Sequence, residues 1–351
     1  MRVLVSGHDG YIGTALVPLF QAAGHEVVGC DSFLFHQSRF GPEAADVPAV
    51  AKDIRDVTPD DLAGFDAVVH LAGISNDPLG DLNADVTYDI NWRGTMDVAR
   101  SAKAAGVPRF LFSSSCSLYG AAGDPPLDEN ATFNPVTPYG ESKLYAERGL
   151  RELADDDFSP TYLRNATAFG VSPRLRGDLV VNNLTGLAFT TGKVLMKSDG
   201  MPWRPLVHIE DIARAFLAVA EAPRDLVHDV PFNVGSTAEN YRVRQVAEMV
   251  AEVVPGSEVA FSDTASADLR NYRVDCDKLR RTLPAFQPRW TVRKGVEELY
   301  SAYLEHGLTY EQLTGPGLIR LARIRELLAH GRLDDGLRPT ADLRIEETAG
   351  V

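Results

Sequence analysis

Two features of the sequence predict an α/β protein built on a doubly wound parallel sheet. Over the first half of the chain, short apolar runs alternate with amphipathic helical segments, and this order requires a parallel sheet with helices on both faces. The first apolar run, residues 2–6, passes directly into a turn that contains three glycines and opens a helix. The combination is typical of a Rossmann-type fold, in which ligands bind at the carboxyl ends of the strands.

The glycine turn is the first element of this fold and predicts a dinucleotide site. Gly7 allows the strand to turn sharply, Gly10 lets the backbone approach a pyrophosphate, and Gly13 lets the new helix pack closely on the strand. The helix N-terminus would offer free N–H groups and a positive dipole end to the phosphates. Tyr11 and Ile12, which lie within the turn, are expected to contact the same cofactor.

The second expected strand, residues 25–31, ends in the acidic residue Asp31. A carboxylate about 20 residues beyond the glycines can accept hydrogen bonds from a ribose 2′-hydroxyl. A 2′-phosphate would meet a like charge there, and the first basic residue that follows is Arg39. The sequence therefore predicts NAD rather than NADP.

The next expected elements continue the alternation of strands and helices. They are a strand near 49–53, a buried strand over 66–73, a helix from Val86 to Ala105 and a strand from Arg109 to Ser115. Gly106 and Pro108 are typical signals for the end of that helix. From Arg174 onward the alternation loosens, which indicates a second region built onto the same body.

The composition excludes several classes of partner. The formal net charge of −14 argues against nucleic acid or an anionic membrane. The chain has no apolar stretch long enough to span a bilayer, and its first strand runs straight into the glycine turn, leaving no room for a signal peptide. We therefore expect a cytoplasmic protein. Cys30, Cys116 and Cys276 are widely spaced and odd in number, which predicts neither a disulfide framework nor a metal site.

The catalytic signal is the segment Tyr139-Gly-Glu-Ser-Lys143. On a helix, positions four apart lie on one face, so Tyr139 and Lys143 would project together. A nearby ammonium favours the phenolate and lowers the pKa of a tyrosine, which makes it a usable general base. Ser115, at the end of the expected strand 109–115, could hold a substrate oxygen beside the tyrosine.

With these motifs in this order, the chain resembles the extended short-chain dehydrogenase/reductase family, and more narrowly its nucleotide-sugar epimerases and dehydratases. The resemblance covers residues 1–305 and implies that Ser115, Tyr139 and Lys143 form the catalytic triad. It places the following residues at the cofactor: Gly7, Gly10, Tyr11, Ile12, Gly13, Asp31, Asp53, Ile54, Leu71, Ala72, Gly73, Asn91, Ser113, Tyr139 and Lys143. Two interpretations of Asn91 stay open, because its amide could instead bridge buried backbone groups.

The same resemblance implies a nucleotide-diphosphate sugar as substrate and a homodimer as the assembly. Arg204 and Arg270 would bind the diphosphate and supply the positive cluster that an acidic chain otherwise lacks. The residues expected at the substrate are Ser75, Ser115, Ser117, Tyr139, Asn165, Asn183, Leu184, Arg204 and Arg270. The expected organisation is an NAD-binding domain (1–173) carrying the triad, an interleaved substrate-binding region (174–305) and a helical C-terminal extension (306–351).

Departures from the family pattern narrow the expected chemistry. The sugar dehydratases and decarboxylases carry an acidic residue just after the catalytic serine or threonine, where this chain has Cys116 and Ser117. The first hypothesis is therefore an NAD-dependent epimerase acting at C4. The alternatives are a 4-ketoreductase of deoxysugar biosynthesis and a nucleotide-binding protein without turnover. The segment 74–78 also departs from the sequence of the galactose-type epimerases. Residues 318–329, beyond the region of resemblance, predict an amphipathic helix that packs on the body.

Overall fold

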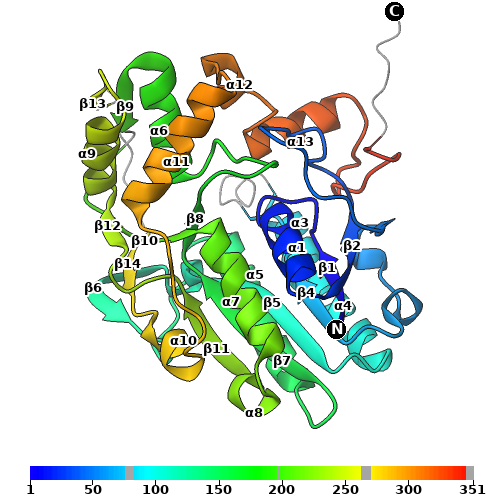
Figure 1. Ribbon diagram of the computed structural model, residues 1–351. Helices are drawn as coiled ribbons and strands as arrows, with labels where there is room; N and C mark the ends of the chain where they lie inside the picture. The colour runs from blue at the N-terminus through cyan, green and yellow to red at the C-terminus, as the bar shows by residue number, and fades with distance from the viewer. Residues whose placement is uncertain (76–82, 197, 262–269, 345–351) are drawn as a thin grey trace, which may run out of the picture.

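A wholly parallel sheet of seven strands forms the centre of the protein (Figure 1). The computed structural model describes residues 1–75, 83–196, 198–261 and 270–344. In the order β11-β7-β5-β4-β1-β2-β3, the strands of the sheet are β11 (Val230–Val234), β7 (Ser159–Asn165), β5 (Arg109–Ser115), β4 (Ala67–His70), β1 (Arg2–Ser6), β2 (Glu26–Asp31) and β3 (Ala49–Ala51). The predicted doubly wound α/β fold is confirmed. Strand order reverses between β1 and β4, which is where such sheets bind ligands.

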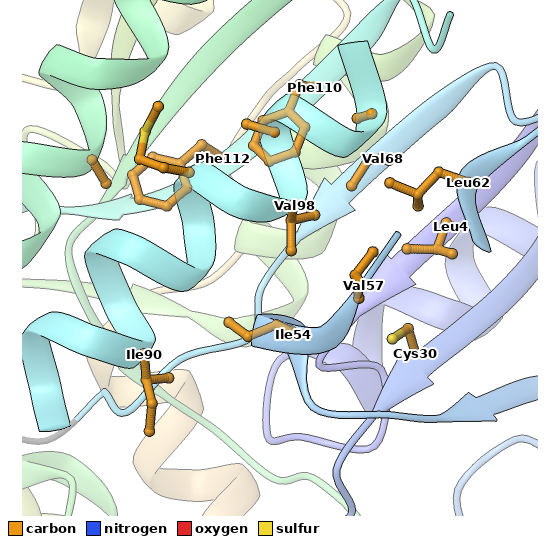
Figure 2. Packing of buried hydrophobic residues seen from close by; sticks show 14 of the residues in the cluster. Leu4, Cys30, Ile54, Val57, Leu62, Val68, Ile90, Val98, Phe110 and Phe112 are labelled. Carbon is orange, nitrogen blue, oxygen red and sulfur yellow. The ribbon is translucent and has the colours of Figure 1, made fainter. Parts of the chain in front are cut away.

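Helices cover both faces of this sheet. Successive residues of a strand point to opposite sides, so strands that are apolar throughout present an apolar face on each side of the sheet. Val5 of β1 packs in the cluster on one face, and its neighbour Leu4 packs in the cluster on the other, together with Val98 (Figure 2). The helices are α1 (Gly13–Ala22) and α7 (Ile209–Glu221) on the first face, and α4 (Thr95–Ala104) and α5 (Pro138–Leu153) on the second. The sheet is therefore buried on both sides, as its continuous apolar strands require.

The helix that the sequence predicts from Val86 to Ala105 is present but not uniform. It consists of α3 (Ala84–Tyr88), one π-helical turn η3 (Asp89–Gly94) and α4, which follow one another directly. A π turn holds one more residue than an α turn and is frequent at functional sites. Sequence periodicity does not reveal such an insertion, because it lasts for a single turn.

Three smaller sheets lie beside the central one, and the second half of the chain supplies most of their strands. Their orders are β12-β10-β8, β13-β9 and β14-β6. The strands are β6 (Ala121–Leu127), β8 (Thr167–Phe169), β9 (Lys193–Met196), β10 (Trp203–His208), β12 (Asn240–Arg242), β13 (Glu258–Phe261) and β14 (Asn271–Val274). Besides α7, the longer helices of this half are α6 (Val180–Thr191), α9 (Val243–Val253) and α11 (Val292–Glu305), which share one apolar core. The other short helices among the described residues are η1 (Ile54–Asp56), η2 (Pro59–Leu62), η4 (Cys116–Tyr119), α8 (Arg224–Val227), α10 (Asp277–Thr282) and α12 (Tyr310–Thr314).

The segment after α12 returns to the N-terminal part of the chain. Its helix α13 (Arg320–Ala329) buries Ile324 and Leu327 in the cluster that also holds Ile54 and Phe33. Figure 1 shows this segment in orange and red beside the blue N-terminal part. The predicted helix over 318–329 is thus present and packs on the body. Within the described residues, no helix combines the length and apolar character needed to cross a bilayer.

Candidate functional site

A cavity of about 530 Å³ lies at the carboxyl ends of the central strands and brings together nearly every residue that the sequence singles out. The predicted residues that line it are Gly7, Gly10, Tyr11, Ile12, Gly13, Asp31, Asp53, Ile54, Leu71, Ala72, Gly73, Ser75, Ser113, Ser115, Ser117, Tyr139, Lys143, Asn165, Asn183, Leu184, Arg204 and Arg270. Asn91 is the one predicted residue that does not line the cavity. One elongated site therefore joins the expected cofactor and substrate halves.

The glycine turn forms a backbone cradle that tolerates no side chains at two of its glycines. Gly7 has φ +77°, and a Cβ there would lie 2.7 Å from the backbone nitrogen of Ala72. A Cβ on Gly13 would lie 2.3 Å from the carbonyl oxygen of Gly7. The Tyr11 hydroxyl donates a 2.7 Å hydrogen bond to the Gly170 carbonyl oxygen, which fixes the turn to the segment that follows β8. These residues fit a dinucleotide pyrophosphate, which needs close backbone approach at a helix start.

Asp31 lies at the end of β2, where its carboxylate faces the glycine turn. It accepts hydrogen bonds from the backbone N–H groups of Asp9, at 3.1 Å, and Phe33, at 2.8 Å. Burial raises the pKa of Asp31, and the neighbouring Asp9 carboxylate adds to this effect. A carboxylate has about four acceptor positions, so two hydrogen bonds leave capacity for ribose hydroxyls.

Asn91 lies fully buried in the π turn and holds the backbone that follows β4. Its Oδ1 accepts from the Ile74 N–H at 2.7 Å, and its Nδ2 donates to the Ile74 carbonyl oxygen at 2.8 Å. A Cβ on Gly73 would lie 2.9 Å from the same Oδ1. Of the two interpretations, the geometry shows the bridging one: Asn91 positions cavity-lining backbone and is not itself in the lining.

The catalytic candidates come from α5 and the end of β5. Pro138 occupies the first position of α5, and Thr137 caps the helix by accepting from the Gly140 N–H at 3.2 Å, so the first turn that carries Tyr139 is well defined. One turn later, the ammonium of Lys143 lies 5.9 Å from the centre of the Tyr139 ring. The Ser115 hydroxyl oxygen accepts from the Ser117 backbone N–H at 3.1 Å.

Lys143 is held as a buried cation. Its ammonium donates a 2.8 Å hydrogen bond to the Ser113 carbonyl oxygen and lies 4.7 Å from the centre of the Phe112 ring. Burial lowers the pKa of Lys143 to about 8, although the Glu147 carboxylate acts in the opposite direction. Such a group is poised to exchange a proton near neutral pH.

A buried ion pair fixes α5 to the sheet behind the site. Glu147, one turn after Lys143, accepts from the Arg164 guanidinium at 2.7 Å and from the Ser114 hydroxyl at 2.5 Å. The Cys116 thiol lies behind the strand as well, donating to the Arg164 carbonyl oxygen at 3.1 Å. Cys116 is absent from the lining of the cavity, whereas Ser117 is part of it.

The substrate half holds polar groups from several elements. Arg204, at the second position of β10, donates to the Trp203 carbonyl oxygen at 2.7 Å and to that of Arg270. Asn165 donates to the Ser113 hydroxyl at 3.0 Å, while its buried Oδ1 has no partner among the described residues. Asn183 lies in the first turn of α6, which begins at Val180.

Sequence reasoning missed the charged residues on the loop before α6 and on α13. Arg176 pairs with Asp178 at 2.9 Å and donates to the Ser75 hydroxyl at 2.9 Å, and both charged residues line the cavity. Burial would raise the pKa of Asp178, but the Arg176 charge holds it below its usual range. The Arg-Leu-Arg-Gly-Asp run at 174–178 was an available signal for this pair. The sequence holds no comparable signal for Arg320, which also lines the cavity. The departure noted at Asn76–Pro78 lies outside the described residues.

Comparisons with known proteins agree with this geometry. The UDP-glucose 4-epimerase of Bacillus subtilis is 27% identical over 339 residues, covering 85% of this chain and 94% of its own. UDP-glucuronic acid decarboxylase 1 of Arabidopsis thaliana is 27% identical over 326 residues, covering 91% and 73%. The solved structure of MoeE5 in complex with UDP-glucuronic acid and NAD is 27% identical, with a TM-score of 0.75 and coverage of 87% of this chain and 99% of that one. Residues 3–235 match the NAD dependent epimerase/dehydratase family. The chain therefore belongs to the NAD-dependent epimerase/dehydratase family.

Proposed function

We propose that this protein is an NAD-dependent nucleotide-sugar epimerase that inverts a hydroxyl, at C4, through transient oxidation to a keto sugar. One observation carries the proposal: Ser115, Tyr139 and Lys143 line the same cavity as the glycine turn and Asp31. NAD is the cofactor of the family to which the chain belongs. When bound, NAD accepts a hydride from the sugar carbon and returns it.

The chain's own residues then move one proton. Tyr139 removes the proton of the sugar hydroxyl during oxidation and returns it after the keto sugar has rotated to present its other face. Ser115 holds the same oxygen by a hydrogen bond. Lys143, whose buried ammonium lies near the Tyr139 ring, favours the phenolate and would also bind the nicotinamide ribose. General acid–base catalysis of this kind contributes about 10²- to 10⁴-fold to the rate.

The substrate proposed for the other half of the cavity is a nucleotide-diphosphate sugar. Arg204 and Arg270 lie together, since the guanidinium of one donates to the carbonyl oxygen of the other, and both line the cavity. Guanidinium groups bind diphosphates through paired, charge-assisted hydrogen bonds. The unpartnered Oδ1 of Asn165 is available to accept from a sugar hydroxyl. We also propose a homodimer, which light scattering after size exclusion would test.

The position after Ser115 favours epimerisation over dehydration. Cys116 is buried away from the cavity, burial raises the pKa of its thiol, and Ser117 offers only a hydroxyl. Elimination of water needs an additional acid and base near the sugar, and neither position supplies a carboxyl group. A 4-ketoreductase remains the second candidate because it needs the same single proton transfer. A protein without turnover is disfavoured by the complete triad.

The test separates epimerase from reductase by the use of cofactor. UDP-, dTDP-, GDP- and CDP-sugars are each incubated with the enzyme and a catalytic amount of NAD. An epimerase interconverts the hydroxyl epimers without a net change in nicotinamide absorbance. Stoichiometric oxidation of NADH or NADPH by a 4-keto sugar, without epimer interconversion, would assign the ketoreductase instead.

A further inference from the structure

Residues beyond 305 complete the wall of the cofactor half of the cavity. Arg320 and Leu337 line it together with Gly10 and Asp31, although more than 280 residues of sequence separate the two groups. The family match ends at residue 235, so it assigns nothing to this segment. The family match therefore leaves the role of Arg320 in the cavity unassigned.

Arg320 is a buried arginine with an incomplete set of partners. It is the first residue of α13 and is only 4% exposed. Its Nη2 donates to the Arg174 carbonyl oxygen at 2.8 Å, and its guanidinium lies 4.2 Å from the centre of the Phe35 ring. Its Nη1 is buried and has no hydrogen-bond partner among the described residues.

The charges around Arg320 do not balance. Arg174 pairs with Asp9 at 2.6 Å, and Arg176 pairs with Asp178 at 2.9 Å. Within the part of the chain that the structure describes, Arg320 has no carboxylate partner within ion-pair distance, so three cations face two anions. Burial lowers the pKa of Arg320 to about 9, and the charge of Arg176 adds to this effect.

The position of Arg320 in its helix makes the imbalance worse. A helix N-terminus carries a partial positive charge and favours anions, not a cation. An unpaired charge in the protein interior is unfavourable unless a counter-charge and hydrogen bonds compensate it. The contact with Phe35 compensates only part of that cost. An anion bound at Nη1 would compensate the rest.

The neighbours of Arg320 identify that anion. Asp9 lies within the glycine turn and binds Arg174, whose carbonyl oxygen accepts from Arg320, so Arg320 is two contacts away from the pyrophosphate cradle. Leu337 lies further along, next to Gly336, whose carbonyl oxygen accepts from Arg55 at 2.9 Å. Arg55 in turn pairs with Asp53, and the resemblance to the extended short-chain dehydrogenase/reductase family implies that Asp53 contacts the adenine. The C-terminal segment therefore follows the cavity from the pyrophosphate cradle to the adenosine end.

We propose that residues 320–338 form a cofactor strap, in which Arg320 binds the pyrophosphate of NAD and Leu337 closes the adenosine end of the cavity. The strap rests on the proposed function only in taking NAD as the cofactor. The ion pair of Arg338 with Asp56, at 2.7 Å, fastens the end of the strap to the N-terminal part of the chain. The strap thus adds a phosphate ligand that the glycine turn itself does not contain.

The test compares Arg320→Gln with Arg325→Gln, which changes an exposed arginine of the same helix. Cofactor-free proteins are titrated by calorimetry with NAD, ADP-ribose and adenosine. Loss of one charge-assisted hydrogen bond to a phosphate should weaken NAD and ADP-ribose about 10- to 100-fold and leave adenosine, which has no phosphate, unchanged. Arg325→Gln should match the wild type with all three ligands.

Two results would overturn the strap. The first is unchanged NAD and ADP-ribose affinity in Arg320→Gln. The second is a loss that appears only in a parallel titration with NADP, which would place Arg320 at a 2′-phosphate. If Arg320→Gln fails to fold, Leu337→Ala in the same titrations decides: it should weaken adenosine as well as NAD, and unchanged binding refutes closure of the adenosine end. Failure of the proposed function looks different, because the wild type itself would then not bind NAD or not epimerise any sugar.

Discussion

Replacing Lys143 by methionine should remove a pH dependence of the stability of the cofactor-free protein that arises from the buried charge of this lysine. Lys143 is 4% exposed, and burial lowers its pKa from 10.5 to about 8. Because the folded protein holds this proton less tightly than the unfolded chain, the charge destabilises the fold fully below pH 8. The penalty is relieved as the pH rises from the folded pKa towards the unfolded one.

The size of this effect follows from the shift. A difference of 2.5 pKa units corresponds to about 3 kcal/mol, of which about 2 kcal/mol is relieved between pH 7 and pH 9.5. Urea unfolding of wild type and Lys143→Met at both pH values gives the free energy of unfolding of each. The wild type should gain about 2 kcal/mol relative to the variant on going to pH 9.5.

The control is Lys294→Met, which removes an exposed lysine of α11 and should differ from the wild type by the same amount at both pH values. Lys143→Met should also lose epimerase activity, since the methionine cannot favour the phenolate of Tyr139. A wild-type gain below about 0.5 kcal/mol, or a gain by the variant, would show that burial does not depress the pKa of Lys143.

Three further outcomes are expected. Tyr139→Phe should lose about 100-fold or more in turnover while still binding NAD. The control Tyr145→Phe, on the same helix, should stay active. Near-normal turnover of Tyr139→Phe would show that Tyr139 is a structural residue. Calorimetry at one salt concentration should show tighter binding of NAD than of NADP, because a 2′-phosphate would meet the Asp31 carboxylate, and equal affinities would remove that argument. Gly13→Ala should abolish measurable NAD binding, since its Cβ would lie 2.3 Å from a backbone oxygen. The control Gly317→Ala, whose Cβ would have no atom within 4 Å, should bind NAD normally. Retained NAD binding in Gly13→Ala would contradict the cradle geometry.

The features that the sequence predicts well are those that depend on local spacing. The glycine turn, Asp31 at a strand end and the Tyr139–Lys143 pair each lie within one strand, turn or helix, so period and residue type are enough to identify them. Their meeting in one cavity follows from the parallel sheet, whose strand ends share one edge. The division of the chain at 173 and 305 stays a prediction.

The features that the sequence does not predict depend on distant contacts. Arg174 and Asp9 are 165 residues apart, and Arg320 reaches Arg174 across 146 residues. An arginine on an amphipathic helix is normally solvated, so nothing in the pattern of α13 distinguishes Arg320 from Arg325. Asn91 presents the same difficulty: its amide binds Ile74, 17 residues earlier, from a π turn that sequence periodicity does not reveal.

The cavity wall includes residues from position 7 to position 337, so the cavity cannot be completed until late in the synthesis of the protein. A ribosome delivers the glycine turn among the first residues and Leu337 more than 300 residues later, at about 5–20 residues per second. The cofactor pocket of each new chain is therefore unfinished for most of its synthesis. A nascent chain that stalls before α13 emerges would present an open cofactor cleft to cellular proteases and chaperones.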